Sequence, residues 1–153
     1  MPKYWIICIS EDNFEISKQH NLIGMSKTKK NDLDEMQVGD IVVFYIAKKT
    51  VDSSSSNPDS RVQAFKGIAE ITSETISSDE LIWKPRGNEI FPHRKQVKFL
   101  ETDLNVPIRP LIEKLSFVTN TIWWALPLRR GYVEIKESDL ELIKGYGHEK
   151  NEK

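Results

Sequence analysis

The residues best suited to chemistry in this sequence are cations that lie in turns between apolar runs. They are spread over several stretches of the chain: Lys27, Lys29, Lys30, Arg86, Arg94, Arg129 and Arg130. A single run of cations is commonly only a solvated face, whereas cations from several loops on one face form a patch that follows phosphates. Because the net charge of the 153 residues is −1, such a patch must act locally.

Four tryptophans accompany these cations. Trp5 opens an apolar run, Trp83 lies in the irregular stretch LIWKPRG, and Trp123 and Trp124 precede ALPLRR. A tryptophan beside lysine, arginine and proline is suited to stacking on a nucleobase, which contributes about 1–3 kcal/mol per base. The alternative is that tryptophans fill the core, which we favour for Trp5 and for one of the adjacent pair. Both interpretations stay open for Trp83.

Catalytic patterns are sparse. The three histidines are isolated in sequence, and neither a Gly-x-Ser-x-Gly turn nor a His-Glu-x-x-His helix occurs. Lys27, Thr28 and Glu70 would form an acid/base group if Lys27 were desolvated enough to lower its pKa. We therefore expect a binding module and keep this lysine group as the enzymatic alternative.

The single cysteine, Cys8, excludes an intramolecular disulfide and a cysteine-based metal cluster. It lies in YWIICIS, which favours a thiol buried in the core. We expect neither a metal nor another cofactor. No apolar run has the length of a membrane span, and the N-terminus lacks a charged-then-apolar signal pattern, so we expect a cytoplasmic protein with no membrane partner.

Short apolar runs bounded by turn residues predict a sheet with few helices. The predicted strands cover residues 3–10, 40–47, 62–72 and 95–101. The predicted helices cover residues 11–20, a short segment from Pro110, and residues 137–147. Too few helices alternate with strands for a doubly wound sheet. The fold class that we predict is therefore α+β, with a small, mostly antiparallel β-barrel flanked by short helices.

The composition, 39% hydrophobic and 29% charged, is that of one globular domain over residues 1–153. Within it we expect a flexible serine-rich loop at about 50–60 and a frayed tail at 146–153. Alternation along three strands predicts an inward-facing set: Ile6, Cys8, Val42, Phe44 and Ile68.

Six short segments follow one another in an order that is typical of one family. They are YWI from Tyr4, DNFE from Asp12, KQHNLIG with its following SK from Lys18, VGDIVVFYIA from Val38, FKGIAEI from Phe65, and IFPHR from Ile90. Together they resemble the EVE domain, a family of the PUA-like superfamily that is related to the YTH readers of methylated RNA. The resemblance extends from about Tyr4 to Lys144 and is strongest to the small single-domain archaeal and bacterial EVE proteins.

The resemblance implies a barrel of five or six strands with a pocket at one end for a modified base in RNA or DNA. The positions that match family positions near the pocket or behind it are Trp5, Asn13, Asn21, Gly24, Ser26, Lys27, Gly39, Asp40, Tyr45, Gly67, Ala69, Phe91 and Pro92. Relatives often have tryptophan at the position of Phe14 and near Ile23. Here Ile23 and Met25 supply an aliphatic wall and a sulfur contact for a base face.

The mechanism that these residues predict is recognition of a base that has left its stack. The base stacks on Trp83 or Trp123, and Asn13 or Ser26 bonds its edge. The predicted base-binding set is Asn13, Asn21, Ile23, Gly24, Met25, Ser26, Trp83, Phe91, Pro92 and Trp123. The predicted phosphate-binding set is Lys27, Lys30 and Arg94.

Two other functions remain open. ASCH domains share the PUA-like barrel, and some are amidohydrolases that act on modified nucleosides. For such an activity Glu70 would have to lie within hydrogen-bond reach of Lys27. A pocket for a free small metabolite would have no basic rim. The partner we predict is a nucleic acid with a modified base. The identity of the modification, RNA or DNA as the carrier, and the oligomeric state stay open.

Overall fold

The computed structural model describes residues 1–53 and 57–151, with side chains as far as residue 147. Its strands are β1 (Tyr4–Ile9), β2 (Leu22–Met25), β3 (Ile41–Lys48), β4 (Arg61–Ile71), β5 (Ile76–Ser77), β6 (His93–Glu101), β7 (Val106–Pro107) and β8 (Tyr132–Ile135). Its α-helices are α1 (Glu11–His20), α2 (Lys30–Glu35) and α3 (Glu137–Asn151). Short 3-10 helices are η1 (Lys27–Lys29), η2 (Pro58–Ser60), η3 (Arg109–Leu111) and η4 (Leu126–Leu128).

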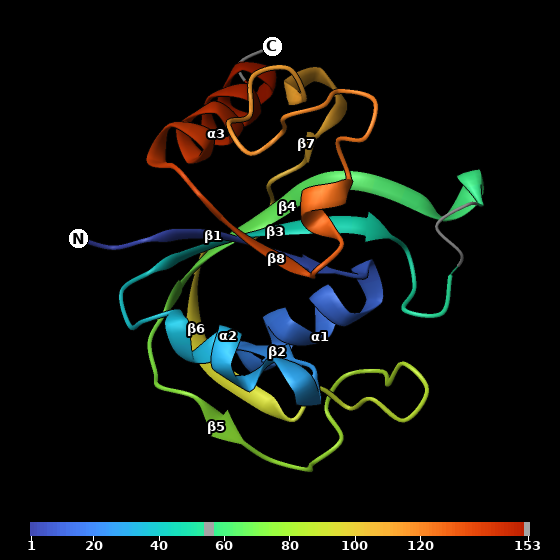
Figure 1. Cartoon of the computed structure of the whole chain (residues 1–153), viewed down its shortest axis with the longest axis vertical. Coiled ribbons are helices and arrows are strands. Elements are labelled where there is room, and N and C mark those ends of the chain that lie inside the picture. Colours follow the sequence, from blue (N-terminus) through green and yellow to red (C-terminus); the bar gives the residue numbers. More distant parts are fainter. Residues whose placement is uncertain (54–56, 152–153) are drawn as a thin grey trace.

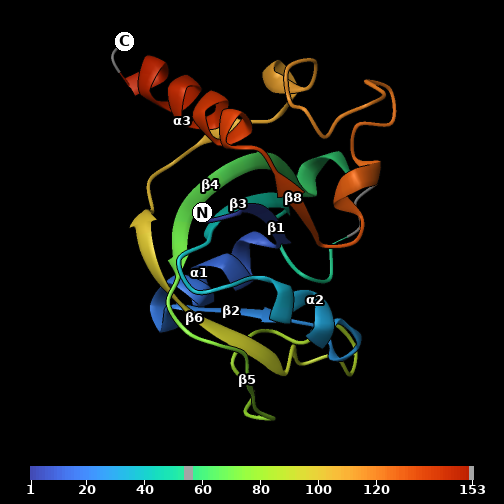
Figure 2. The same ribbon diagram turned by 60° about the vertical axis from the view of Figure 1, so that its left-hand side comes forward.

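The strands form one curled sheet in the order β2-β6-β4-β3-β1-β8, with β5 beside β6 and β7 beside β4. Only β1 and β3 pair in parallel, and all other described pairs are antiparallel. Figure 2 shows the sheet curling around α1 from β8 and β1 to β6 and β2. The α+β class and the mostly antiparallel curl are thus confirmed, as a half-barrel whose two end strands are not paired with each other in the described chain.

Both faces of the central strands are buried. Along β1, Ile6 belongs to one hydrophobic cluster and Ile7 to the other, and along β3 the same alternation separates Val43 from Val42. Strands buried on both faces read as continuous apolar runs. This explains why the predicted strands are confirmed while the predicted inward set is not. Its four buried members lie on different faces: Ile6 and Ile68 on one, Val42 and Phe44 on the other.

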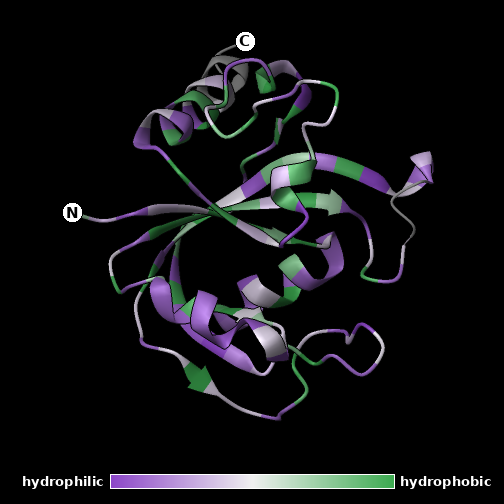
Figure 3. Ribbon diagram, in the orientation of Figure 1, coloured by the Kyte–Doolittle hydropathy of each residue, from purple (hydrophilic) through white to green (hydrophobic). Residues whose placement is uncertain are grey.

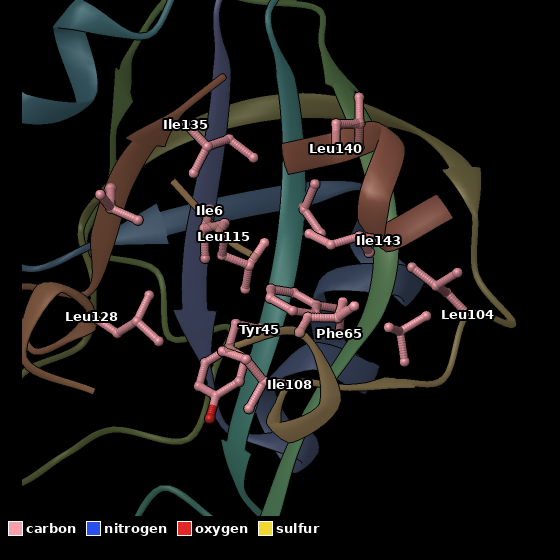
Figure 4. Packing of buried hydrophobic residues seen from close by; sticks show 14 of the residues in the cluster. Ile6, Tyr45, Phe65, Leu104, Ile108, Leu115, Leu128, Ile135, Leu140 and Ile143 are labelled. Carbon is pink, nitrogen blue, oxygen red and sulfur yellow. The ribbon is translucent and has the colours of Figure 1, made fainter. Parts of the chain in front are cut away.

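One cluster fills the layer between the sheet and α3. Figure 4 shows Leu140 and Ile143 of α3 over Ile6, Tyr45 and Phe65 of the sheet. The segment that carries β7 and η3 closes the same layer, with α3, as the upper part of Figure 1 shows. This face is fully covered by the chain's own elements.

Helix α1 lies inside the curl (Figure 1), and its Phe14 belongs to the other cluster. Phe14 of α1 contacts Phe44 and Phe99, with ring centroids 5.2 and 6.2 Å away. The missing side chain of Gly67 makes this possible, since a Cβ there would lie 2.7 Å from the Phe14 ring. Helix α1 is thereby fixed within the curl.

Other parts of the chain depart from the sequence-based expectation. The lysine-rich segment before Gly39 was expected as a loop, but it contains η1 and the short helix α2, whose Leu33 is fully buried. Figure 3 shows that hydrophilic residues predominate on α2, which is why the helix is hard to see in the sequence. Helix α3 continues to Asn151, into the expected tail. Residues 54–56 and 152–153, which belong to the expected loop and tail, lie outside the described residues.

One buried cation lacks a hydrogen-bond partner among the described residues. Lys95 of β6 pairs across the ladder with Ile23 and is 0% exposed. Its Nζ has no hydrogen-bond partner in the described part of the chain. A buried ammonium without a hydrogen bond costs free energy, and its attraction to Asp34 offsets part of that cost.

The described helices include none with the length and apolar character needed to cross a membrane.

Candidate functional site: a cleft between β1 and β2

Two adjoining hollows, of about 220 and 170 Å³, lie between β1 and β2 and together form what we call the cleft. The two hollows have seven lining residues in common: Ile7, Cys8, Gly24, Arg86, Phe91, Arg129 and Gly131. The walls therefore come from β1, β2, the loop 78–92 and the turn between η4 and β8. The inner hollow adds buried residues such as Ile23 and Trp83, and the outer hollow adds Ser26, Lys29 and Arg130. Each hollow is smaller than a typical drug-sized pocket of about 300–1,000 Å³ and suits a single planar ring.

Trp83 forms a buried wall of the inner hollow. It is 3% exposed, and its indole Nε1 donates a 2.8 Å hydrogen bond to Ser17 Oγ of α1. The ring lies directly on Gly24, where a Cβ would stand 2.6 Å from it, and Phe91 meets it edge-on at 6.4 Å. Trp83 is buried although its sequence neighbours are polar, because Ser17, Gly24 and Phe91 surround its ring in the folded chain. Trp83 thus shapes the cleft but offers little free ring surface.

Asn13 holds the loop that carries Trp83. Its Nδ2 donates to the Lys84 carbonyl at 3.0 Å, and its Oδ1 accepts from the Lys84 N–H at 2.8 Å. The carboxylate of Glu89 ties the far end of this loop, accepting from the N–H groups of Lys27 and Phe91 at 3.1 and 3.0 Å. Loop 78–92 is therefore anchored to both α1 and the segment after β2. The Asn13 amide is largely occupied by this task.

Arg94 is a structural cation beneath the same loop. It is 3% exposed, its Nε donates to the Phe91 carbonyl at 3.1 Å, and its Nη2 donates to the Glu80 carbonyl. The guanidinium lies 5.2 Å from the Trp83 ring centroid. Burial lowers the pKa of Arg94 from its ordinary value, and an arginine remains charged under such a shift. Its donors point to the protein's own backbone and ring.

Five cations border the cleft, namely Lys29, Lys48, Arg86, Arg129 and Arg130, and among the described residues no aspartate or glutamate lines either hollow. Lys29 and Arg130 approach the ring of Tyr132 at 5.5 and 5.2 Å. The Tyr132 hydroxyl donates to Asp32, and this hydrogen bond, followed by burial, raises the pKa of Tyr132. Arg86 and Arg129 line both hollows. The result is a local positive field on a chain of nearly zero net charge.

Cys8 lies on the cleft wall, is partly buried and packs against the cluster that contains Ile6, so the expectation of a core thiol is confirmed in part. Its Sγ donates to the Leu128 carbonyl at 3.5 Å. Burial raises the pKa of Cys8 to about 12, which keeps the thiol protonated at neutral pH.

The predicted base-binding residues divide into two groups. Those that line the cleft are Asn13, Ile23, Gly24, Met25, Ser26, Trp83 and Phe91. Three others lie outside its lining. Asn21 ends α1 in a left-handed conformation with φ 54°, Pro92 stands beside β6, and Trp123 is 58% exposed on the segment before η4.

None of the three predicted phosphate-binding residues lines the cleft. Lys27 is exposed outside it, Lys30 forms a 3.0 Å ion pair with Asp34, and Arg94 is buried. The residues that line it instead are Lys29, Arg86, Arg129 and Arg130, all from the wider set of loop cations. Sequence reasoning missed Ser10 and Lys48, since their place on the cleft follows from the ends of β1 and β3 lying side by side.

The lysine-based catalytic group is not assembled. The Lys27 carbonyl contacts His93 at one end of β6, whereas Glu70 pairs with Lys98. Five residues of strand separate these points, roughly 16 Å at about 3.3 Å per residue. Neither a hydrogen bond nor an ion pair joins Lys27 to Glu70 in the described chain. The described residues also contain no group of three or more His, Cys, Asp or Glu placed to hold a metal.

Comparisons with known proteins give a consistent assignment. The model of the EVE domain matches residues 3–146. A UPF0310 protein of Pyrococcus horikoshii is 31% identical over 145 residues, covering 92% of this chain and 96% of the relative. Two solved YTH domains share the fold. The mmi1 domain, solved with RNA, has a TM-score of 0.62 at 12% identity and covers 95% of this chain and 82% of its own. The Zygosaccharomyces rouxii MRB1 domain, solved with N6-methyladenosine RNA, has a TM-score of 0.61 at 15% identity, covering 95% and 85%.

Proposed function

The chain belongs to the EVE domain family, and we propose that it binds a nucleic-acid strand by holding one modified, unstacked base in the cleft. The observation that carries this proposal is the lining of the cleft, which combines aromatic and aliphatic walls with five cations and, among the described residues, no carboxylate. The RNA bound by the two YTH neighbours supports a nucleic acid as the ligand class.

The base enters the inner hollow, where apolar side chains cover its faces. Because Trp83 is almost fully buried, it acts as a fixed wall, and the more exposed Phe91 with Ile9 supplies free apolar surface. Removing a base from its stack costs a few kcal/mol, least for a strand that is already single. Contact with the apolar walls offsets that cost.

The backbone of the strand lies over the outer hollow. Lys29 and Arg130, which border it and rest on Tyr132, face the flanking phosphates. Such contacts fix the register of the strand and carry no sequence information. They also predict binding that weakens with salt, by about 0.7 in the log–log slope for each contact to a single strand.

The test compares two double variants that each remove two charges. The double variant Lys29→Gln/Arg130→Gln should reduce the slope of log affinity against log salt concentration for a single-stranded oligonucleotide by about 1.4, because two phosphate contacts are lost. The double variant Lys27→Gln/Lys30→Gln, whose two sites lie outside the cleft, should leave this slope unchanged. If the slope fell only for the Lys27/Lys30 variant, the strand would contact those lysines outside the cleft, and the proposed path over the outer hollow would be refuted. Absence of any oligonucleotide binding would refute the whole proposal.

The two competing functions have less support. An amidohydrolase built on Lys27 and Glu70 requires two groups that lie apart, since Lys27 is on η1 beside one end of β6 and Glu70 of β4 pairs with Lys98. A site for a free uncharged metabolite would not require the basic border that Lys29 and Arg130 form.

A further inference from the structure

Most polar side chains on the inner hollow are already used by the protein itself. The hydroxyl of Ser10 donates to Asp12, and the Asn13 amide bonds to the backbone of Lys84 on both of its ends. The Nζ of Lys48 donates to the carbonyls of Val51 and Ser53, at 3.0 and 3.1 Å. These groups shape the hollow and have little hydrogen-bonding capacity left for a ligand.

Two arginines are the exception. Arg86 comes from loop 78–92 and Arg129 from the turn before β8, so they approach the cleft from different walls, and both line both hollows. In the described chain neither guanidinium has an ion pair, a side-chain hydrogen bond or an aromatic ring beneath it. They differ in this from Lys29 and Arg130, which rest on Tyr132.

Three carboxylates of the neighbouring elements have hydrogen-bond donors of their own. Glu89, on the loop of Arg86, accepts from two backbone N–H groups. Asp12 accepts from Ser10 and from its neighbour's N–H, and Asp32 accepts from Tyr132. In the described chain no ion pair joins Arg86 or Arg129 to any of these three carboxylates.

We propose that Arg86 and Arg129 bind an anionic substituent on the planar ring held in the inner hollow, a carboxylate in particular. A guanidinium has five donors and no acceptor, so the ligand group between them must offer acceptors only. A carboxylate does so and accepts two parallel N–H bonds from an arginine. This inference rests on the proposed function, and it narrows the modified base to one that carries an acidic group.

A phosphate is the other anion that arginines bind, and it predicts different behaviour. Phosphate contacts are the same whichever base is presented. A carboxylate contact strengthens binding only when the base carries that group. The identity of the base substituent, with the strand held constant, therefore separates the two anions.

The experiment uses three labelled single-stranded oligonucleotides that differ only at the central base: cytosine, 5-methylcytosine or 5-carboxylcytosine. The unchanged protein should bind the carboxylated strand about tenfold more tightly than the methylated one, which corresponds to about 1.4 kcal/mol. Combining Arg86→Gln with Arg129→Gln should abolish that preference, while Lys114→Gln, at an exposed site away from the cleft, should keep it. Melting temperatures of all variants establish that they are folded.

Equal affinity for the three strands, or a preference that survives loss of both arginines, would overturn the inference and leave the proposed function standing. Free 5-carboxylcytidine distinguishes the reverse case. If it binds through the two arginines while no oligonucleotide binds, the anion site stands and the proposed function fails. If neither the nucleoside nor any strand binds, both are refuted.

Discussion

A single methyl group at Gly24 should disrupt the cleft, because the ring of Trp83 occupies the space that a side chain would need. A Cβ at this position would lie 2.6, 2.7 and 3.2 Å from three ring carbons, and contacts below 3.0 Å force one group to move. The ring cannot turn away freely, since its Nε1 bonds Ser17 at 2.8 Å and Arg94 lies 5.2 Å from its centroid. Overpacking of this kind costs about 1–3 kcal/mol.

The measurement is urea and thermal unfolding of Gly24→Ala beside Gly145→Ala. A Cβ at Gly145 meets no atom within 4 Å, and the residue lies in α3. The second substitution should therefore stabilise the protein by roughly 0.5–1 kcal/mol, through the higher helix propensity of alanine. For a chain of this size each kcal/mol shifts the melting temperature by about 2–4 °C. We expect Gly24→Ala to melt roughly 2–12 °C lower than the unchanged protein.

The affinity for oligonucleotides is a second measurement on the Gly24→Ala and Gly145→Ala variants. Displacement of Trp83 changes the wall of the inner hollow, so Gly24→Ala should bind oligonucleotides more weakly even where it is fully folded. If Gly24→Ala proved as stable as Gly145→Ala, the contact between Gly24 and Trp83 would not be a constraint on the fold. Our account of the cleft wall would then be refuted.

Three further outcomes follow from buried or half-buried groups. Ser17→Ala should cost about 1–3 kcal/mol in urea unfolding, because it leaves a buried indole N–H without its acceptor; an unchanged midpoint would contradict that bond. Lys95→Met should raise the free energy of unfolding, by roughly 1–3 kcal/mol, since it replaces a buried ammonium that has no hydrogen-bond partner in the described chain with an apolar chain of similar length; a loss of stability would show that the attraction between Lys95 and Asp34 outweighs the cost of burial. Cys8, with a pKa of about 12 against an ordinary 9.0, should be alkylated at pH 8 roughly a thousandfold more slowly than a free thiol, because the thiolate fraction falls tenfold per pH unit. The rate should continue to rise with pH beyond 9, and a plateau near pH 9 would contradict the burial of this thiol.

Strands were predictable here because apolar runs bounded by turn residues mark them, whichever face they use. The assignment of faces was not predictable from alternation. Ile6 and Val42 are both fully buried but lie in different clusters, since α3 covers one side of the sheet and α1 the other. Where both faces are buried, the period of two that separates inside from outside disappears.

The site was predictable as a set of cations but not residue by residue. Lys29 and Lys30 are neighbours in sequence, yet η1 and α2 direct Lys29 to the cleft while Lys30 pairs with Asp34 four residues later. The spacing of that i,i+4 pair was one available signal that a helix begins there. Trp83 shows the same limit, because its burial depends on α1, distant in sequence.

The chain's connectivity explains why the ligand site lies between β1 and β2. These strands are consecutive and joined by α1, but the sheet order puts β2 at one end and β1 next to the other. Both edges of β1 are paired, with β3 and with β8, so the cleft separates β1 from β2 with no ladder between these two strands in the described chain. Helix α1 spans the gap, and Asn13 and Ser17 on it hold Lys84 and Trp83 of loop 78–92. The shape of the cleft is thus set by side chains of one helix rather than by strand pairing. Substitutions on that face of α1 should change binding without altering the sheet.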